Sequence, residues 1–462
     1  MLTEPRWAAG PQPKRANARF APICSGPTCA RCPSLNFLLR KQAFTMLPRR
    51  KMNVRMETQH RGIVQAVFGR RPLNAIAWAS LVGCLLFSVL AESAAAQESQ
   101  LPTIAATSDL SSALPATEWS RVEASVDIGL NWLAAQQAAD GRFPSQPVAQ
   151  PAVTSLAIMA FLSRGHVPDH GRYGKQITKA IDFVLSTQKR RGYFCLLPLT
   201  PTGSRPTTSQ TVSYNHAMAG LMLGEVYGMT KGGQSRRIEQ ALADALFYHR
   251  QVQTRVKSHP AFNGGWRYGY PDSPKASSDM SITGWSLMFL RSARNAEFQV
   301  PKNYFDEGLD FVERCFVEEP ELREKGVFSY LPAKAPGGEK RSVTLANTAS
   351  AMLTLILGGR HDTEMIRAGT EWFRTRDYPR PWQNNFFYLA SYYSSQAMAQ
   401  VGGDTWNQIY PQIARNMIEE QSDDGSWPLG TGQERNYTST YTTSLAILAL
   451  TPAYQLLPIF QR

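Results

Sequence analysis

Three features that are common in other proteins are scarce in this 462-residue sequence. Only two of its six cysteines, Cys195 and Cys315, follow residue 96, and two isolated cysteines do not make a disulfide framework. His216 is the only histidine on a segment predicted as an inner helix, so no set of three or four zinc ligands can be assembled. Runs that alternate apolar and polar residues are nearly absent, which argues against a β-sheet fold. We therefore expect an all-helical protein with no metal or other cofactor.

Acidic residues are scarce at the N-terminal end alone, and this explains the formal net charge of +13. Fourteen of the 49 Lys and Arg residues, but only three of the 36 Asp and Glu residues, lie within residues 1–96. The rest of the chain is close to neutral and has no electrostatic footprint for a polyanion. We expect no nucleic-acid partner.

The N-terminal region contains the pattern of a secretory signal. Arg70 and Arg71 precede an apolar run over residues 75–91, and an A-x-A-like cleavage site follows at Ala96. The run is shorter than the roughly 20 residues that a membrane-spanning helix needs. We predict that residues 56–96 are a signal peptide, and that the protein is exported to the periplasm or secreted with no stable transmembrane helix after cleavage. Lipoprotein anchoring at Cys84 is a minor alternative.

Two further segments flank this signal. Residues 1–55 are rich in Pro and Arg and are interpreted as a disordered or over-called extension. Residues 97–118 are rich in Ser, Ala, Thr and Pro, which suits a flexible linker. The folded domain is expected over residues 119–458. Three methionines are plausible true starts of the protein: Met46, Met52 and Met56.

A short motif recurs along the folded domain. Gln421–Trp427 reads QSDDGSW, a glutamine, three residues, a glycine, one residue and an aromatic, and the same template occurs at Gln137–Phe143 and Gln188–Phe194. Its glycine-aromatic half returns at Gly264–Trp266 and Gly326–Phe328. Self-similarity at this spacing indicates a repeat array. The residues that we assign to the repeat are Gln137, Gly141, Phe143, Gln188, Gly192, Phe194, Gly264, Trp266, Gly326, Phe328, Gln421, Gly425 and Trp427.

An amphipathic helical pattern precedes each of these turns, and a nearly uniform apolar pattern follows it. The amphipathic patterns cover residues 122–133, 177–185, 238–246, 305–316, 366–373 and 409–417, and the apolar ones 152–162, 212–227, 280–290, 343–357, 386–398 and 441–450. An apolar helix is stable only when it is buried on all sides, whereas an amphipathic helix needs one covered face. Two concentric layers meet both demands, and closure into a ring leaves no bare end. We predict an (α/α)6 toroid of about twelve helices.

The repeated turn has a structural role of its own. A glycine just past a helix permits the left-handed conformation that ends it. The glutamine amide can bond backbone groups that are freed at the helix end, and the aromatic ring can pack on the neighbouring hairpin. We therefore interpret the motif as scaffolding.

These copies resemble the QW repeats of squalene–hopene and oxidosqualene cyclases, whose α/α toroid is shared with protein prenyltransferase β-subunits. The resemblance covers about residues 120–455, and Tyr214–Thr230 and Ser278–Leu290 resemble exported bacterial prenyltransferase or squalene-oxidase repeat proteins. In squalene–hopene cyclases the middle Asp of a DxDD(T/S) motif protonates an alkene. The closest stretch here keeps Asp279 at the first position and has Ser281 in place of the proton donor. The resemblance thus implies the fold, while the activity does not follow from it.

The cavity of a toroid opens at the ends of its inner helices, so polar residues there are candidates for ligand binding. Asp279 is the candidate catalytic residue, and its structural interpretation is a helix N-cap. The candidate ligand-binding residues are Tyr214, Asn215, His216, Ser281, Asn347, Tyr388, Tyr392 and Thr440. Their structural interpretations are helix starts, a core histidine and an aromatic core.

The first functional hypothesis is an exported toroid that binds an apolar, isoprenoid or glycan-like ligand, or a partner, in its central cavity. The alternative is a terpenoid or polyprenyl cyclase with Asp279 in the acid site. A third possibility is a structural envelope protein whose ring is plugged. The oligomeric state does not follow from the sequence.

Overall fold

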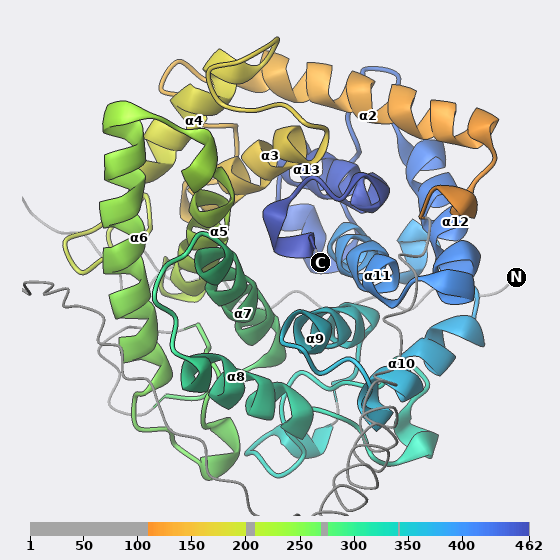
Figure 1. Cartoon of the computed structure of the whole chain (residues 1–462). Helices are drawn as coiled ribbons and strands as arrows, with labels where there is room; N and C mark the ends of the chain where they lie inside the picture. The colour runs from red at the N-terminus through yellow and green to blue at the C-terminus, as the bar shows by residue number, and fades with distance from the viewer. Residues whose placement is uncertain (1–109, 200–207, 269–275, 341, 462) are drawn as a thin grey trace, which may run out of the picture. The chain divides into compact units, whose positions relative to one another are not determined.

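Helices make up the regular structure of this protein, which was obtained as a computed structural model (Figure 1). The structure describes residues 110–199, 208–268, 276–340 and 342–461, all within a unit spanning Glu98–Arg462. These ranges contain twelve α-helices and isolated β-bridges but no β-strand. The predicted signal peptide, Cys84 and most of the predicted linker lie outside the described residues.

Six helices form an inner layer, and they are the segments with the nearly uniform apolar pattern (Figure 1). They are α3 (Ala152–Ser163), α5 (Thr208–Val226), α7 (Met280–Asn295), α9 (Leu345–Leu357), α11 (Phe387–Val401) and α13 (Ser439–Leu450). All twelve residues of α3 are buried, and so are all those of α9 except Ala346. Because these helices have no polar face, they are stable only inside a second layer of helices.

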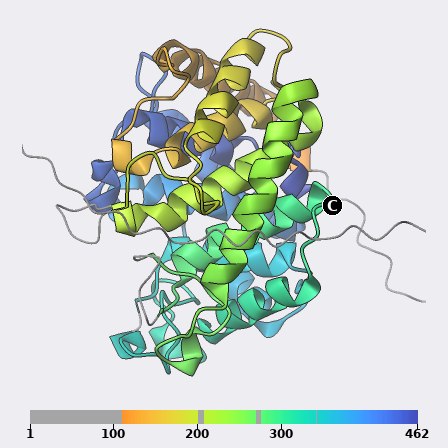
Figure 2. The same cartoon turned by 90° about the vertical axis from the view of Figure 1, so that its left-hand side faces the viewer.

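The six amphipathic helices form that outer layer. They are α2 (Ala116–Gln136), α4 (Gly174–Ser186), α6 (Gly232–Gln253), α8 (Lys302–Arg314), α10 (Glu364–Arg374) and α12 (Gly403–Glu420). Figure 2 shows one of them, α6, running across the outside of the ring. On α4, for example, Ile177, Ile181 and Val184 are fully buried while Lys175 and Lys179 point outward. Each outer helix therefore covers the inner layer with one apolar face.

The ring is closed. Each inner helix contacts the next, and α13 also contacts α3, while the last outer helix, α12, contacts the first, α2. Arg415 on α12 forms a two-pronged ion pair with Glu118 on α2, at 3.1 Å for both contacts. The predicted (α/α)6 toroid is confirmed.

The glutamines of the repeated turns join neighbouring hairpins. The Nε2 group of Gln421 donates to the carbonyl of Gly425 in its own turn and to the carbonyl of Ser125 on α2, at 2.9 and 3.0 Å. Gln137 and Gln188 make the same pair of bonds, to their own turn and to α4 and α6 respectively. Each amide thereby satisfies a carbonyl at the end of one hairpin and another on the next outer helix.

The third turn uses a glutamine that the repeat template does not identify. Gln253 lies eleven residues before Gly264, yet it donates to the carbonyl of Gly264 and to that of Tyr304 on α8, both at 2.9 Å. The turn between Gln253 and Gly264 is longer than in the other repeats. The glutamine therefore makes the same two hydrogen bonds, although its distance in sequence from the glycine differs from that in the repeat template.

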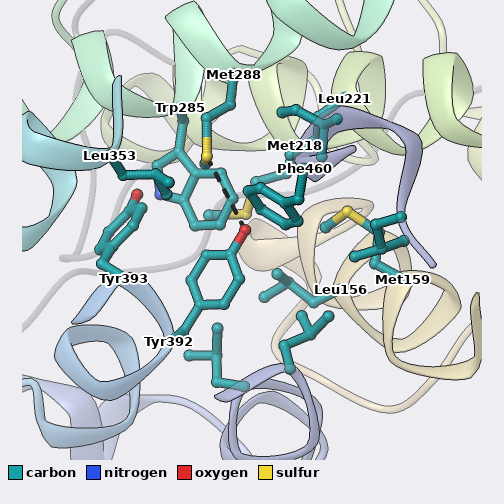
Figure 3. Close-up of a cluster of buried hydrophobic side chains, with 14 of the residues drawn as sticks. Leu156, Met159, Met218, Leu221, Trp285, Met288, Leu353, Tyr392, Tyr393 and Phe460 are labelled. Atoms are coloured by element: carbon teal, nitrogen blue, oxygen red, sulfur yellow. Dashed lines mark hydrogen bonds between the residues drawn. The ribbon is translucent and has the colours of Figure 1, made fainter. Parts of the chain in front are cut away.

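The centre of the ring is filled by side chains from the inner helices (Figure 3). Trp285 on α7 stacks on Tyr392 on α11 with 5.7 Å between ring centroids, and the Tyr392 hydroxyl lies 4.0 Å from the sulfur of Met288. These three side chains are 0 to 1% exposed. A side chain that lined a water-sized cavity would keep accessible surface, so this level of the ring holds no open channel among the described residues.

The C-terminal segment closes the ring at the far ends of the inner helices. Phe460, in the short helix η10 (Pro458–Phe460), lies in the central cluster of Figure 3 and is 4% exposed. The carboxylate of Glu225, at the end of α5, accepts hydrogen bonds from the backbone N–H of Ile459 at 3.1 Å and from the hydroxyl of Ser292 at 2.5 Å. Burial raises the pKa of Glu225 to about 7.

Candidate functional site

The candidate site lies at the N-terminal ends of the inner helices, where Asp279 begins α7. Its Oδ1 atom accepts a hydrogen bond from the backbone N–H of Ile282 at 2.9 Å, so Asp279 is the N-cap of the helix. Its Oδ2 atom has no hydrogen-bond partner among the described residues and lies 3.8 Å from the Nε atom of Arg267. One carboxylate oxygen is therefore structural, and the other faces the Arg267 guanidinium.

Burial sets the protonation of this carboxyl group. Asp279 is 0% exposed, and its burial raises the pKa to about 6, against the opposing effect of the Arg267 guanidinium. A carboxyl group with this pKa can exchange a proton near neutral pH. The same burial is also usual for an N-cap under a packed ring, so the shift alone does not assign a reaction.

Three half-buried tyrosines, Tyr214, Tyr268 and Tyr330, lie near Asp279 and Arg267, and a fourth, Tyr437, lies near Tyr214. Tyr214 on α5 hydrogen-bonds with the hydroxyl of Ser281 at 2.9 Å, and Arg267 donates to the hydroxyl of Tyr268 at 2.9 Å. The Arg267 guanidinium also lies over the rings of Tyr268 and Tyr330, 4.7 and 5.4 Å from their centroids. We call this group the tyrosine cluster; its members are Tyr214, Arg267, Tyr268, Asp279, Ser281, Tyr330 and Tyr437.

The members of the tyrosine cluster are close enough to affect each other's charge. Burial, followed by the charge of Asp279, raises the pKa of Tyr214 and of Tyr330. Tyr437, which precedes α13, acts on Tyr214 in the same way. The cluster therefore joins α5, α7 and the segment before α13 across the end of the ring.

Two predicted residues on α5 have their polar atoms directed away from this cluster. Asn215 accepts from the backbone N–H of Ala152 at 3.1 Å and donates to the carbonyl of Val148 at 2.8 Å, so its amide fixes the start of α3. His216 is buried among aromatic rings, with His249 at 5.3 Å and Phe289 at 5.7 Å between centroids. Neither of its ring nitrogens has a hydrogen-bond partner among the described residues, and burial lowers its pKa to about 3.

The remaining predicted residues are also buried in the ring wall. The backbone N–H of Asn347 bonds the hydroxyl of Thr344, and that of Tyr388 bonds the carboxylate of Glu434 at 3.2 Å. Tyr392 lies in the central cluster, and Thr440 is 2% exposed with its carbonyl bonded to Ser444. Of the predicted residues, the structure brings together Tyr214, Asp279 and Ser281.

Four members of the tyrosine cluster are not among the candidate residues given above: Arg267, Tyr268, Tyr330 and Tyr437. Arg267 and Tyr268 directly follow Trp266, the aromatic residue of the third repeated turn. Since that turn leads back to the inner layer, the residues after its aromatic position reach the ends of the inner helices. Position relative to the repeat was thus a signal that could have identified them. Tyr330 stands at the same offset after the fourth turn, two residues beyond Phe328.

No group of three or more His, Cys, Asp or Glu side chains that could hold a metal ion occurs within the described ranges. The two cysteines there, Cys195 and Cys315, are free and buried. In the same ranges, no helix combines the length and apolar character that crossing a membrane requires.

Comparison with known proteins supports the fold. No protein-family model matches the sequence, and no curated protein matches it. Among solved structures, a variant of an α-1,6-mannanase from Salegentibacter sp. HEL1_6 in complex with α-1,6-mannotriose is similar, with a TM-score of 0.51 and 10% identity over 73% of this chain and 99% of that chain. A variant of the type II terpene cyclase MstE from Scytonema is similar with a TM-score of 0.46 and 13% identity, over 74% of this chain and 100% of that chain. At 10% identity, the likeness to the mannanase shows a shared α/α-toroid fold alone.

Proposed function

We propose that this protein binds a neutral carbohydrate chain at the tyrosine cluster. The observation that carries the proposal is the set of four half-buried tyrosines, with one guanidinium and one carboxyl group between them, at an end of the ring. Aromatic faces pack on the apolar faces of sugar rings, and phenol and guanidinium groups bond sugar hydroxyls. The mannanase described above has the same fold, but the proposal depends on the residues of this chain.

The packed centre of the ring favours a sugar over an isoprenoid. A C15 or longer apolar chain would need a channel between the inner helices, and Trp285, Met288 and Tyr392 fill that level. A carbohydrate needs only the partly exposed surface that the tyrosine cluster offers. Of the ligands that the sequence leaves open, we therefore propose the glycan-like one.

The test is binding of soluble neutral polysaccharides, with α-mannan, β-glucan and xylan as probes in affinity electrophoresis and titration calorimetry. We expect saturable binding of at least one probe, and a loss of about tenfold in affinity for Tyr268→Ala and for Tyr437→Ala, because each removes an aromatic contact surface. Phe247→Ala is the matched control, since Phe247 is 69% exposed on the outer helix α6. Absence of saturable binding to all three probes, or equal losses in the control, would refute the proposal.

The alternative is the terpenoid cyclase, and one observation favours it: the unbonded Oδ2 atom of a buried carboxyl group whose pKa is raised to about 6. Asp279→Asn keeps an N-cap acceptor but removes the acid. If the protein converts squalene or polyprenyl diphosphates and this variant does not, the cyclase hypothesis replaces ours. Under our proposal neither protein forms a product, and Asp279→Asn binds the polysaccharide within about threefold of the original chain.

We also propose that the protein acts outside the cytoplasm, as the apolar run over residues 75–91 and the site at Ala96 indicate. Mass spectrometry of the protein purified from a bacterial host should identify Gln97 as the mature N-terminus. A peptide that spans Ala96–Gln97 in the mature protein would contradict cleavage at this position.

A further inference from the structure

The fifth turn of the ring, which joins α10 to α11, differs from the other turns between an outer and an inner helix. The other five turns contain a glycine with positive φ, whereas residues 375–386 contain no glycine. In four of the five, a Cβ atom on that glycine would lie within 2.5 Å of an atom of the next outer helix: Gly141, Gly192, Gly264 and Gly425. These turns are thus in direct contact with the neighbouring hairpin. The fifth turn lacks this glycine and contacts the next outer helix, α12, through hydrogen bonds instead: the amide of Asn416 donates to the carbonyl of Pro379 at 3.2 Å, and the backbone N–H of Tyr378 donates to Gln412 at 2.8 Å.

A cavity of about 540 Å³ lies beside this fifth turn. Its wall is formed by the fifth turn, from Arg376 to Pro379 and from Gln383 to Phe386, together with the end of α10 and the first residues of α9. Ligand pockets of globular proteins have volumes of about 300–1,000 Å³, so this volume suits a small organic molecule. The cavity is separate from the tyrosine cluster, since none of the residues of that cluster lines it.

The floor and one wall of the cavity are apolar. Val343, Leu345 and Phe373 are buried below it, and the half-buried ring of Trp372 forms a wall. The indole N–H of Trp372 donates to the carbonyl of Arg323 at 2.8 Å, which fixes the orientation of the ring. This lining favours a ligand with a ring or a short hydrocarbon body.

The rim of the cavity carries an excess of positive charge. Lys325 and Arg376 are exposed cations there, and Asp377 is the single anion of the lining. The Arg376 guanidinium lies 5.1 Å from the centroid of the Trp372 ring, at the wall. The first turn of α9, with Leu345 and Ala346, also lines the cavity, and the N-terminal end of a helix has partial positive charge.

We propose that this cavity binds a small amphipathic monoanion. The apolar body of the ligand lies against Trp372 and Phe373, and its acidic group faces Lys325 and Arg376. The cavity is lined by the one turn that has no glycine, and so the site belongs to this turn and not to the toroid in general. It is independent of carbohydrate binding at the tyrosine cluster.

The experiment compares two fluorescent probes of similar shape on the purified protein: the anionic 8-anilinonaphthalene-1-sulfonate and the neutral N-phenyl-1-naphthylamine. We expect saturable binding of the anionic probe. The double variant Lys325→Gln/Arg376→Gln should bind the anionic probe with about tenfold lower affinity, while its affinity for the neutral probe should change by less than about threefold. The matched control is Lys334→Gln/Arg374→Gln, which removes two exposed cations that do not line the cavity.

Filling the cavity tests its location. Ala346→Phe and, independently, Asn385→Trp should each lower the affinity for both probes by about tenfold or more, because the added ring takes the space of the ligand. The thermal unfolding midpoint of each variant shows that it is folded. The proposal is overturned if neither probe binds saturably, if the charge control matches the Lys325/Arg376 variant, or if folded filling variants bind as the original chain does.

Discussion

Gly264→Ala is expected to lower the free energy of unfolding by about 3 kcal/mol or more. Gly264 has φ +81°, which an alanine adopts only under strain, and a Cβ atom would lie 2.0 Å from the carbonyl oxygen of Glu307 on α8. Because that atom belongs to the backbone, it moves only if the whole outer helix shifts. The turn would have to give up its contact with α8, including the bonds from Gln253 to Gly264 and Tyr304.

Urea or guanidinium unfolding followed by circular dichroism measures this effect. Gly233→Ala is the matched control, because Gly233 lies in the outer helix α6 and a Cβ atom there would have open space within 4 Å. Alanine is the better helix former by about 1 kcal/mol, so this control should be neutral or slightly stabilising. An unchanged midpoint for Gly264→Ala would mean that the turns do not hold the hairpins together.

The second large effect expected is a loss of stability in acid caused by His216 and His249. Both are buried and packed against each other, and burial lowers the pKa of His216 to about 3 and that of His249 well below its ordinary value. The unfolded chain takes up these protons at about pH 6.5, while the folded chain resists them. Stability from these groups is therefore present above pH 6.5 and is lost as the pH falls toward the folded pKa. At pH 5 the loss for His216 alone is about 2 kcal/mol.

Three buried carboxyl groups act in the opposite direction. The pKa values of Asp279, Glu225 and Glu434 are raised to about 6, 7 and 7, mainly by burial. The stability that they contribute is present at low pH and is lost as the pH rises through these values. The pH dependence of the whole protein is thus a difference of two effects, and a variant is needed to isolate the histidine.

His216→Phe isolates it. On going from pH 7 to pH 5, the free energy of unfolding of this variant should fall by about 2 kcal/mol less than that of the original chain. Any change in packing is present at both pH values and cancels in this comparison. His170→Gln, at an exposed position, should leave this difference unchanged. If His216→Phe also leaves it unchanged, the histidine is charged or solvated in the folded protein.

The sequence predicts a residue of the candidate site correctly only where its position depends on its own helix alone. Asp279 was identified as the start of an apolar helix, and Tyr214 and Ser281 were selected as polar residues near helix ends, where the structure places them. Asn215 and His216 are neighbours of Tyr214 in sequence, yet they point to α3 and to α6. Successive residues on a helix are about 100° apart, so the direction of each depends on which helix lies beside it.

The two layers of helices and their closure into a ring could be predicted from the amino-acid pattern alone. The spacing of apolar residues and the residue types of the turns are local properties of the sequence. A helix that is apolar on every side, such as residues 152–162, is stable only when it is buried, whichever helices surround it. The side chains and cavities within and between the hairpins become apparent only in the folded chain. Whether Trp285, Tyr392 and Phe460 fill the ring, and whether the fifth turn leaves a cavity, depends on side chains from distant segments that meet only when the ring closes. Such complementarity is a property of volumes in three dimensions, and no pattern along one helix contains it.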